Sequence, residues 1–160
     1  MQYKIWDLDG TVIDSRHRYS TLENGDIDLP KWISDNTRAN IEKDTLLPLA
    51  ELMRSNYRQG DIVIICTARV LGVWDHVFLA DHGIKAHFIL SRALGDNRGD
   101  AEMKKAKLIA LFADLKIPFA RWTKNATFYD DNVGVLSMAE SIGIRAKNAL
   151  RLNLKLTKKA

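Results

Sequence analysis

The sequence predicts an α/β fold: a single Rossmann-like, doubly wound parallel sheet of about five strands. Two observations support this prediction. Short apolar runs alternate along the chain with amphipathic segments that have the period of a helix, and such alternation is typical of βαβ units. The length of 160 residues fits one domain. A composition of 46% hydrophobic and 28% charged residues excludes collagen, coiled coils and wholesale disorder.

The expected elements follow from these patterns in chain order. Apolar runs rich in β-branched and aromatic residues predict strands at 3–8, 62–66, 86–90, 127–129 and 143–146. Helical periodicity predicts helices at 46–58, 71–82, 101–115 and 133–141. Gly60 and Gly83 stand just beyond two of these helices, where glycine commonly ends a helix. Ligand sites in such a sheet are expected just beyond the carboxyl ends of the strands.

One long segment, residues 15–43, is polar and lacks clear periodicity. Asn24-Gly25 marks a turn within it, and one helix is expected near 31–41. Loops of this length usually serve as lids or binding surfaces, and a passive insertion is the alternative. We therefore expect one domain over residues 1–150, with a small lid or insertion at 15–43 instead of a full cap domain, and a basic tail at 151–160.

Charge and cysteine content bear on partners and location. The net charge of +4 comes from a C-terminal stretch without acids, whose six bases are Arg145, Lys147, Arg151, Lys155, Lys158 and Lys159. This stretch is expected to be a frayed, solubilising terminus, and binding to phosphate backbones is the alternative. Cys66 is the single cysteine, which excludes an intramolecular disulfide and predicts a reducing, cytoplasmic location. No membrane span or signal peptide is expected, because no apolar run is long enough.

Polar residues gather where three of the predicted strands end. Asp7 and Asp9 leave the first strand on one side, because side chains alternate along a strand. Thr67 follows the second strand, and Asp130-Asp131 follow the fourth. The ends of parallel strands converge, and two carboxylates ~4 Å apart repel each other by about 4 kcal/mol at an effective dielectric constant of about 20. A cation is therefore expected there, and clustered oxygen ligands suit Mg²⁺ best.

These motifs resemble the haloacid dehalogenase (HAD) superfamily of aspartate-nucleophile phosphatases. That family has DxDGT[LV] after its first strand, Thr or Ser after the second, a Lys on a later helix and an acid pair after the fourth. The matching residues occur here in the same order: 7–12 (DLDGTV), Thr67, Lys104 and Asp130-Asp131. The resemblance implies a HAD-like fold and an Mg²⁺-dependent phosphatase that forms an aspartyl-phosphate intermediate.

The resemblance also implies a role for each matching residue. Asp7 would attack phosphorus, and Asp9 would protonate the leaving oxygen and then activate water. Thr67 and Lys104 would donate hydrogen bonds to the phosphoryl oxygens. The implied ligands of Mg²⁺ are Asp7, Asp9 through its backbone carbonyl, Asp131 and, behind it, Asp130.

Simpler interpretations stay open for several of these residues. Thr67 would otherwise cap the end of its strand. Lys104 would otherwise be a solvated helix residue, with Lys105 or Lys107 acting in its place. The acid pair at 130–131 would otherwise cap the helix that follows it.

Three segments resemble more closely the 3′-phosphatase half of phage polynucleotide kinase. Residues 67–69 (TAR) are similar to its Ser-Gly-Arg, residues 95–104 to its GDxRxDxxxK, and residues 44–48 (DTLLP) to the segment before its first long helix. By this resemblance, the residues that bind substrate or orient Lys104 are Thr11, Arg18, Arg69, Arg98 and Asp100. Asn132 stands where that family tends to have Arg, and no GxxxxGK[ST] motif of a kinase half occurs.

The expected function is Mg²⁺-dependent hydrolysis of a phosphomonoester, with polynucleotide 3′-phosphate ends or nucleotides as substrates, because a site without a large cap admits the end of a polymer. An alternative enzyme is a nucleotide or sugar phosphate phosphatase that a neighbouring subunit closes in an oligomer. An alternative of another class is a non-catalytic phosphate-binding or receiver-like signalling domain. A receiver carries its acid pair after the first strand and its phosphoacceptor after the third, which is the reverse of the order here.

Overall fold

A five-stranded parallel sheet forms the centre of the molecule. The computed structural model describes residues 1–159, and the strands of this sheet are β1 (Tyr3–Trp6), β4 (Ile62–Thr67), β5 (Phe88–Ser91), β6 (Ala126–Asp130) and β7 (Arg145–Asn148). They lie in the order β5–β4–β1–β6–β7, and every neighbouring pair is parallel. The chain therefore builds from β1 to one edge and then to the other, which confirms the predicted doubly wound α/β class.

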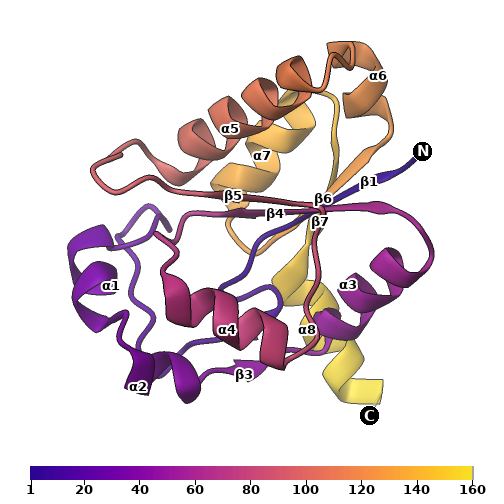
Figure 1. Cartoon of the computed structure of the whole chain (residues 1–160). Coiled ribbons are helices and arrows are strands. Elements are labelled where there is room, and N and C mark those ends of the chain that lie inside the picture. Colours follow the sequence, from indigo (N-terminus) through magenta and orange to yellow (C-terminus); the bar gives the residue numbers. More distant parts are fainter. Residues whose placement is uncertain (160) are drawn as a thin grey trace.

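Helices cover both faces of this sheet (Figure 1). On one face lie α3 (Leu49–Arg58), α4 (Val73–Asp81) and α8 (Ala149–Lys159). On the other face lie α5 (Asp100–Asp114), α6 (Phe119–Lys124) and α7 (Val133–Ser141). The result is a three-layered molecule in which the sheet is covered on both sides, as parallel sheets generally are.

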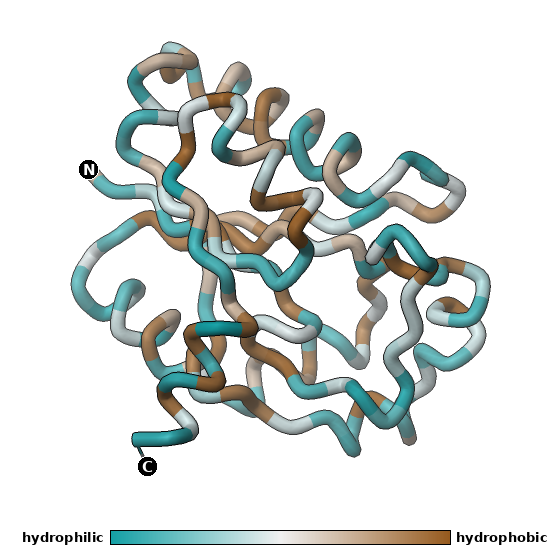
Figure 2. Tube along the Cα trace, turned by 180° about the vertical axis from the view of Figure 1, so that it is seen from behind, coloured by the Kyte–Doolittle hydropathy of each residue, from teal (hydrophilic) through white to brown (hydrophobic). Residues whose placement is uncertain are grey.

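Each face of the sheet has its own apolar core, because successive residues of β1 point to opposite faces. Trp6 packs with Met53 of α3 on one face, whereas Ile5 packs with Leu108 and Phe112 of α5 on the other. Figure 2 shows that many apolar positions lie toward the centre of the molecule, whereas the outer turns of the chain are mainly hydrophilic. Among residues 1–159, no helix combines the length and the apolar character that crossing a membrane requires.

The segment after β1 contains two short helices, and a two-stranded sheet joins its beginning to its end. Its helices are α1 (Leu29–Asp35) and α2 (Arg38–Glu42), so the single helix expected near 31–41 is two, and Thr37 begins the second by accepting a hydrogen bond from the Asn40 N–H. At its base, β2 (Ile13–Asp14) pairs antiparallel with β3 (Thr45–Leu46). Because Leu46 belongs to this pair, the helix predicted from residue 46 begins three residues later.

The basic C-terminal stretch is ordered structure, and the expectation of a frayed tail is corrected here. Its first four residues, Arg145–Asn148, form the edge strand β7. The helix α8 follows directly and packs beside α3 (Figure 1). The buried Asn153 side chain accepts a hydrogen bond from the Leu49 N–H at 2.9 Å and donates one to the Thr11 carbonyl at 2.9 Å. These bonds and the buried Ala149 hold the helix against the domain; Ala160 lies outside the described residues.

Candidate active site

The carboxyl ends of β1, β4 and β6 meet beside the first turns of α5, and polar side chains from all four elements lie together there. This is the edge at which parallel α/β sheets place their ligands. The residues that line one cavity at this edge include Asp7, Asp9, Thr67, Lys104, Asp130 and Asp131. The structure thus brings together the residues that the strand-end pattern singled out.

Asp7 lies at the centre of this group. The Lys104 ammonium donates to Asp7 Oδ1 at 2.9 Å and to Asp130 Oδ2 at 2.7 Å. The Thr11 hydroxyl donates to the other oxygen of Asp7, Oδ2, at 3.2 Å. Lys104 is only 2% exposed, so it is not the solvated helix residue of the simpler interpretation.

Gly10 allows the chain to turn tightly at the end of β1. Its φ of +77° lies in the left-handed region, which residues with a Cβ rarely adopt. A Cβ atom at this position would also lie 2.3 Å from Asp131 Oδ2. The glycine therefore serves two purposes: it sets the turn between Asp9 and Thr11, and it leaves room for the Asp131 carboxylate beside this turn.

The carboxylates of the site are held in a buried, mutually repelling arrangement. The pKa of Asp7 is raised to about 7, first by burial and then by Asp130, while Lys104 opposes both effects. Burial and the neighbouring Asp7 raise the pKa of Asp131 to about 7. Burial alone would lower the pKa of Lys104, but Asp130 and Asp7 raise it well above its ordinary value. One ammonium is thus shared by several acids, which favours an additional cation.

Three of these acids could hold that cation. Asp7, Asp130 and Asp131 each offer a carboxylate oxygen, and these oxygens lie within 4.8 Å of one another. Hard oxygen donors of this kind suit Mg²⁺, which is usually bound by one or two carboxylates together with water and substrate phosphate. The donor set and its unbalanced negative charge therefore fit the magnesium ion that the resemblance implies.

Asp9 lies in a separate ion-pair network at the same edge. Arg69 binds it with two nitrogens, Nε at 3.1 Å from Asp9 Oδ2 and Nη2 against Oδ1, and the Ser15 hydroxyl donates to Oδ1 at 2.8 Å. The remaining nitrogen of the Arg69 guanidinium binds Asp75, and its carbon lies 4.9 Å from the centre of the Trp32 ring. Arg69 is therefore occupied in positioning Asp9 in this conformation.

Of the other predicted substrate-binding residues, one lies at the site cavity and two lie outside it. Asp100 lines the site cavity and accepts a hydrogen bond from the Ile27 N–H at 3.0 Å. Arg18 is buried and binds Asp44 through two nitrogens, outside the carboxylate cluster. Arg98 is exposed and pairs with Asp96 of its own loop. The structure therefore does not bring Arg18 or Arg98 to the cluster around Asp7.

Two residues at this edge were not predicted. Arg92 is buried and donates to the Ala68 carbonyl at 2.9 Å and to Asp100 Oδ1 at 2.9 Å, so it supports the start of α5. It directly follows β5, and the rule applied to the other strand ends would have found it. Tyr19 lines the site cavity from the segment after β2, where no local signal marked it.

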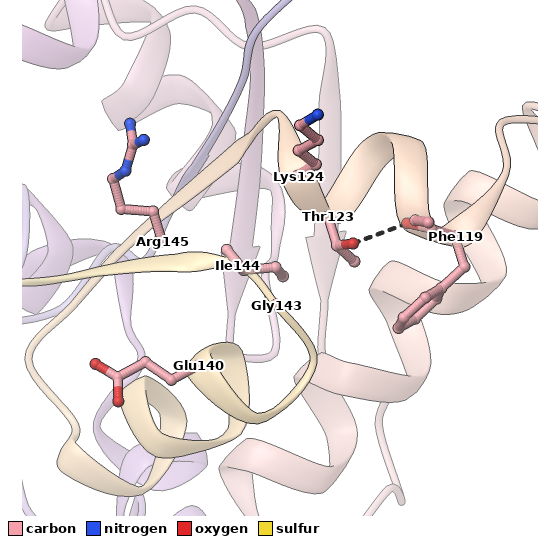
Figure 3. A pocket seen from close by; sticks show the side chains of 8 residues that line it. Phe119, Thr123, Lys124, Glu140, Gly143, Ile144 and Arg145 are labelled. Carbon is pink, nitrogen blue, oxygen red and sulfur yellow. Dashed lines mark hydrogen bonds between the residues drawn. The ribbon is translucent and has the colours of Figure 1, made fainter.

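The site is covered in this structure. Tyr19, Ile27 and Asn132 line the cavity above the carboxylates, which has a volume of about 10 Å³. A larger hollow of about 560 Å³ lies at the opposite edge of the sheet, near the starts of β6 and β7. Figure 3 shows that its side chains include Lys124 and Arg145 but a single acid, Glu140. It lacks clustered carboxylates, so the small covered cavity is the candidate site for the phosphatase chemistry.

Comparison with known proteins places the chain in a family. Residues 1–159 match the family model described as Bacteriophage T5 5′-deoxynucleotidase. The chain belongs to this family. It is 30% identical over 175 residues to the 5′-deoxynucleotidase of Escherichia phage T5, a match that covers 93% of this chain and 67% of that protein.

Solved structures agree on the fold. A chain of the Pnkp1/Rnl/Hen1 RNA repair complex is 24% identical with a TM-score of 0.62, over 91% of this chain and 41% of that one. A HAD-superfamily hydrolase of Geobacter sulfurreducens is 12% identical with a TM-score of 0.65, over 91% of this chain and 88% of that one. The chain thus spans less than half the length of the repair protein. The HAD-like fold and the phosphatase class of enzyme expected for this family member are confirmed.

Proposed function

We propose that this protein removes the 5′-phosphate from deoxynucleoside 5′-monophosphates, with Asp7 as nucleophile and Mg²⁺ as cofactor. The observation that carries the chemistry is the position of Asp7, whose carboxylate is held by Lys104 and Thr11 beside two further acids. The substrate class is supported by the family, because its phage T5 member is a 5′-deoxynucleotidase and the match extends over residues 1–159.

The reaction divides into two displacements. An oxygen of Asp7 attacks phosphorus, the bond from phosphorus to the 5′ oxygen breaks, and Asp9 gives a proton to that oxygen, which leaves the nucleoside and an aspartyl-phosphate. In the second displacement, a water oxygen attacks phosphorus, and Asp9 takes a proton from that water molecule. The bond between phosphorus and Asp7 breaks, which releases inorganic phosphate and restores the Asp7 carboxylate.

Neighbouring side chains prepare these steps. Lys104 and Thr67 line the cavity and can donate to the phosphoryl oxygens, where charge-assisted hydrogen bonds are strongest. Arg69 and Ser15 hold the Asp9 carboxylate in place. To act as an acid in the first displacement, Asp9 would have to leave the pairing with Arg69 and take up a proton, which the second displacement then restores from water.

The same carboxylates provide the metal site. Asp7 and Asp131 would hold Mg²⁺ together with the Asp9 carbonyl, while Asp130 stays paired with Lys104. When bound, Mg²⁺ neutralises negative charge on the phosphoryl group and on the acids around it.

A panel of phosphate esters tests the proposal. Release of inorganic phosphate is measured from deoxynucleoside 5′-monophosphates, deoxynucleoside 3′-monophosphates, 3′-phosphorylated oligonucleotides and sugar phosphates, each with Mg²⁺ and with EDTA. We expect the highest kcat/KM for the 5′-monophosphates and no turnover with EDTA. A preference of about tenfold (1.4 kcal/mol) or more for any other class would overturn the substrate assignment.

Polynucleotide 3′-phosphate ends are the second candidate substrate. The sequence similarity of residues 95–104 to polynucleotide 3′-phosphatases favours it. The cavity at Asp7 has a volume of about 10 Å³ and is lined by Tyr19 and Ile27, so either substrate has to displace these side chains, and the covered site does not by itself distinguish the two. The oligonucleotide arm of the same panel separates the two candidates.

A further inference from the structure

A second cavity adjoins the covered site. It has a volume of about 370 Å³ and lies between the segment that contains α1 and the loop from β5 to α5. Ile27 and Asp100 line both cavities and therefore form the partition between them. A volume of about 300–1,000 Å³ is typical of pockets that bind small molecules.

The walls of this second cavity differ in chemistry. The apolar residues of one wall are Leu22, Ile27, Leu29 and Pro30, although Asn24 and Asp26 of the same segment also line the cavity. Asn97 contributes an exposed amide from the loop between β5 and α5. Such a combination suits a flat group that is apolar on its faces and polar at its edge, since apolar side chains pack on the face and amides bind the edge.

The charged residues of the cavity do not favour a phosphate as its occupant. Two acids, Asp26 and Asp100, are balanced by two bases, Arg92 and Arg98. Arg92 is buried, and its guanidinium donates to the Asp100 carboxylate and to three backbone carbonyls, those of Ala68, Asp96 and Arg98. The Arg98 guanidinium pairs with the Asp96 carboxylate. The bases of the cavity are thus balanced in number by its acids, and the cavity offers no excess of positive charge to an anion. A neutral occupant is favoured.

We infer that this cavity binds the nucleobase of the substrate, an inference that rests on the proposed nucleotidase function. The phosphate would lie at Asp7, the sugar at the partition, and the base between the apolar wall and Asn97. Because the Ile27 N–H is bonded to Asp100, a nucleotide that occupies both cavities shifts Ile27 and breaks or lengthens this bond.

Methyl NMR tests the base site without catalysis. Thymidine and deoxyadenosine, which carry no phosphate, are titrated into the full chain, and the methyl signals of leucine and isoleucine are followed. We expect shifts at Leu22, Ile27 and Leu29, and none at Leu94, which is 77% exposed in the β5–α5 loop and does not line the cavity. Silent methyl groups at the first three positions, with saturating nucleoside, would overturn the inference.

A matched pair of variants tests the same site in turnover. Leu22→Ala removes part of the apolar wall, and Leu94→Ala makes the same change outside the cavity; both side chains are more than half exposed, at 51% and 77%. Leu22→Ala should raise KM for deoxynucleoside 5′-monophosphates by about tenfold, a typical effect of losing an apolar contact to the substrate. Leu94→Ala should leave KM for the same nucleotides within about twofold of the wild type.

Failure of this inference is distinguishable from failure of the proposed function. If 5′-monophosphates are hydrolysed while the methyl groups stay silent and Leu22→Ala behaves like Leu94→Ala, the base lies elsewhere and only the inference falls. If nucleosides shift the three methyl groups but 5′-monophosphates are not hydrolysed, the base site stands and the proposed 5′ specificity falls.

Discussion

Lys104 balances the charge of two acids at the centre of the site. Its ammonium joins Asp7 from β1 to Asp130 from β6 through bonds of 2.9 and 2.7 Å in a nearly water-free position. A buried charge is stable only when it is paired. Lys104 therefore fixes the position of the Asp7 side chain relative to Asp130, and its positive charge offsets the repulsion between these two carboxylates.

Asp7→Asn should keep the fold and abolish turnover. An amide cannot form the acyl phosphate, and hydrolysis of phosphate monoesters is so slow without catalysis, with accelerations up to ~10²¹, that no bystander group can compensate. Circular dichroism checks the fold, and phosphate release checks the activity. Retention of more than about one percent of wild-type kcat (2.7 kcal/mol) would show that Asp7 is not the nucleophile.

The two acids at the end of β6, Asp130 and Asp131, should differ in their effect on magnesium binding. Asp130 is already bound by Lys104 and by the Asn132 N–H at 2.9 Å, whereas Asp131 lies against the turn at Gly10. Loss of a group that supports a metal ligand typically costs about 10–100-fold in affinity. We expect about that cost for Asp130→Asn and a larger one for Asp131→Asn, measured as the Mg²⁺ concentration that gives half-maximal activity. Equal shifts, or a larger one for Asp130→Asn, would reverse the assignment.

At the scale of elements, the central strands were predictable because their information is local. The apolar runs that end in Asp7, Thr67 and Asp130 are visible in the sequence, and the rule that parallel strand ends converge placed these residues together. The helix α8 was not predictable in the same way, because its leucines recur at every second position from 150 to 156, which does not have the period of a helix. The contacts that anchor it, from Asn153 to Leu49 and Thr11, join residues more than one hundred positions apart.

The arginines show the same limit within the site. The resemblance to the 3′-phosphatase implied phosphate binding, but Arg69 and Arg18 are each paired with acids that lie 60 and 26 positions away, Asp9 and Asp44. Which carboxylate an arginine binds is decided by tertiary packing. A motif therefore identifies the residue type that a site needs more readily than it identifies the partner of that residue.

Asn153→Ala should weaken the attachment of α8. The change leaves the Leu49 N–H and the Thr11 carbonyl without their partner, and an unsatisfied buried polar group costs about 1–3 kcal/mol. We expect the free energy of unfolding in urea to fall by an amount in this range. The exposed Lys155→Ala serves as a control and should change it by less than about 0.5 kcal/mol. An Asn153→Ala variant as stable as the control would show that α8 is held by apolar contacts alone.

For the molecule as a whole, the buried acids make stability depend on pH and on magnesium together. The pKa values of Asp7 and Asp131, each about 7, lie above the ordinary value of 3.8. The folded chain therefore binds protons that the unfolded chain releases as pH rises from about 4 to about 7, so the metal-free protein loses stability over this range.

Magnesium should restore that stability, and more strongly where the acids are ionised. Since the ion binds carboxylates and competes with protons, we expect a larger rise of Tm on adding Mg²⁺ at about pH 8 than at about pH 5, measured by differential scanning calorimetry. Ca²⁺-free and Mg²⁺-free buffer provides the baseline at each pH. A rise that is equal at both values, or larger at the lower one, would contradict protonation of these acids.

The bond between Asn153 and Thr11 also bears on how the protein is made. Thr11 belongs to the loop that carries Asp7 and Asp9, and it leaves the ribosome early, whereas its anchor is 142 positions later in the chain. Lys104 and Asp130, which bind around Asp7, are likewise translated long after it. A nascent chain therefore carries Asp7 for a long stretch of synthesis before the groups that bind it are made. If Asp7 acts as proposed, a ribosome stalled before residue 104 carries a chain that lacks both Lys104 and Asp130, and such a chain should be inactive.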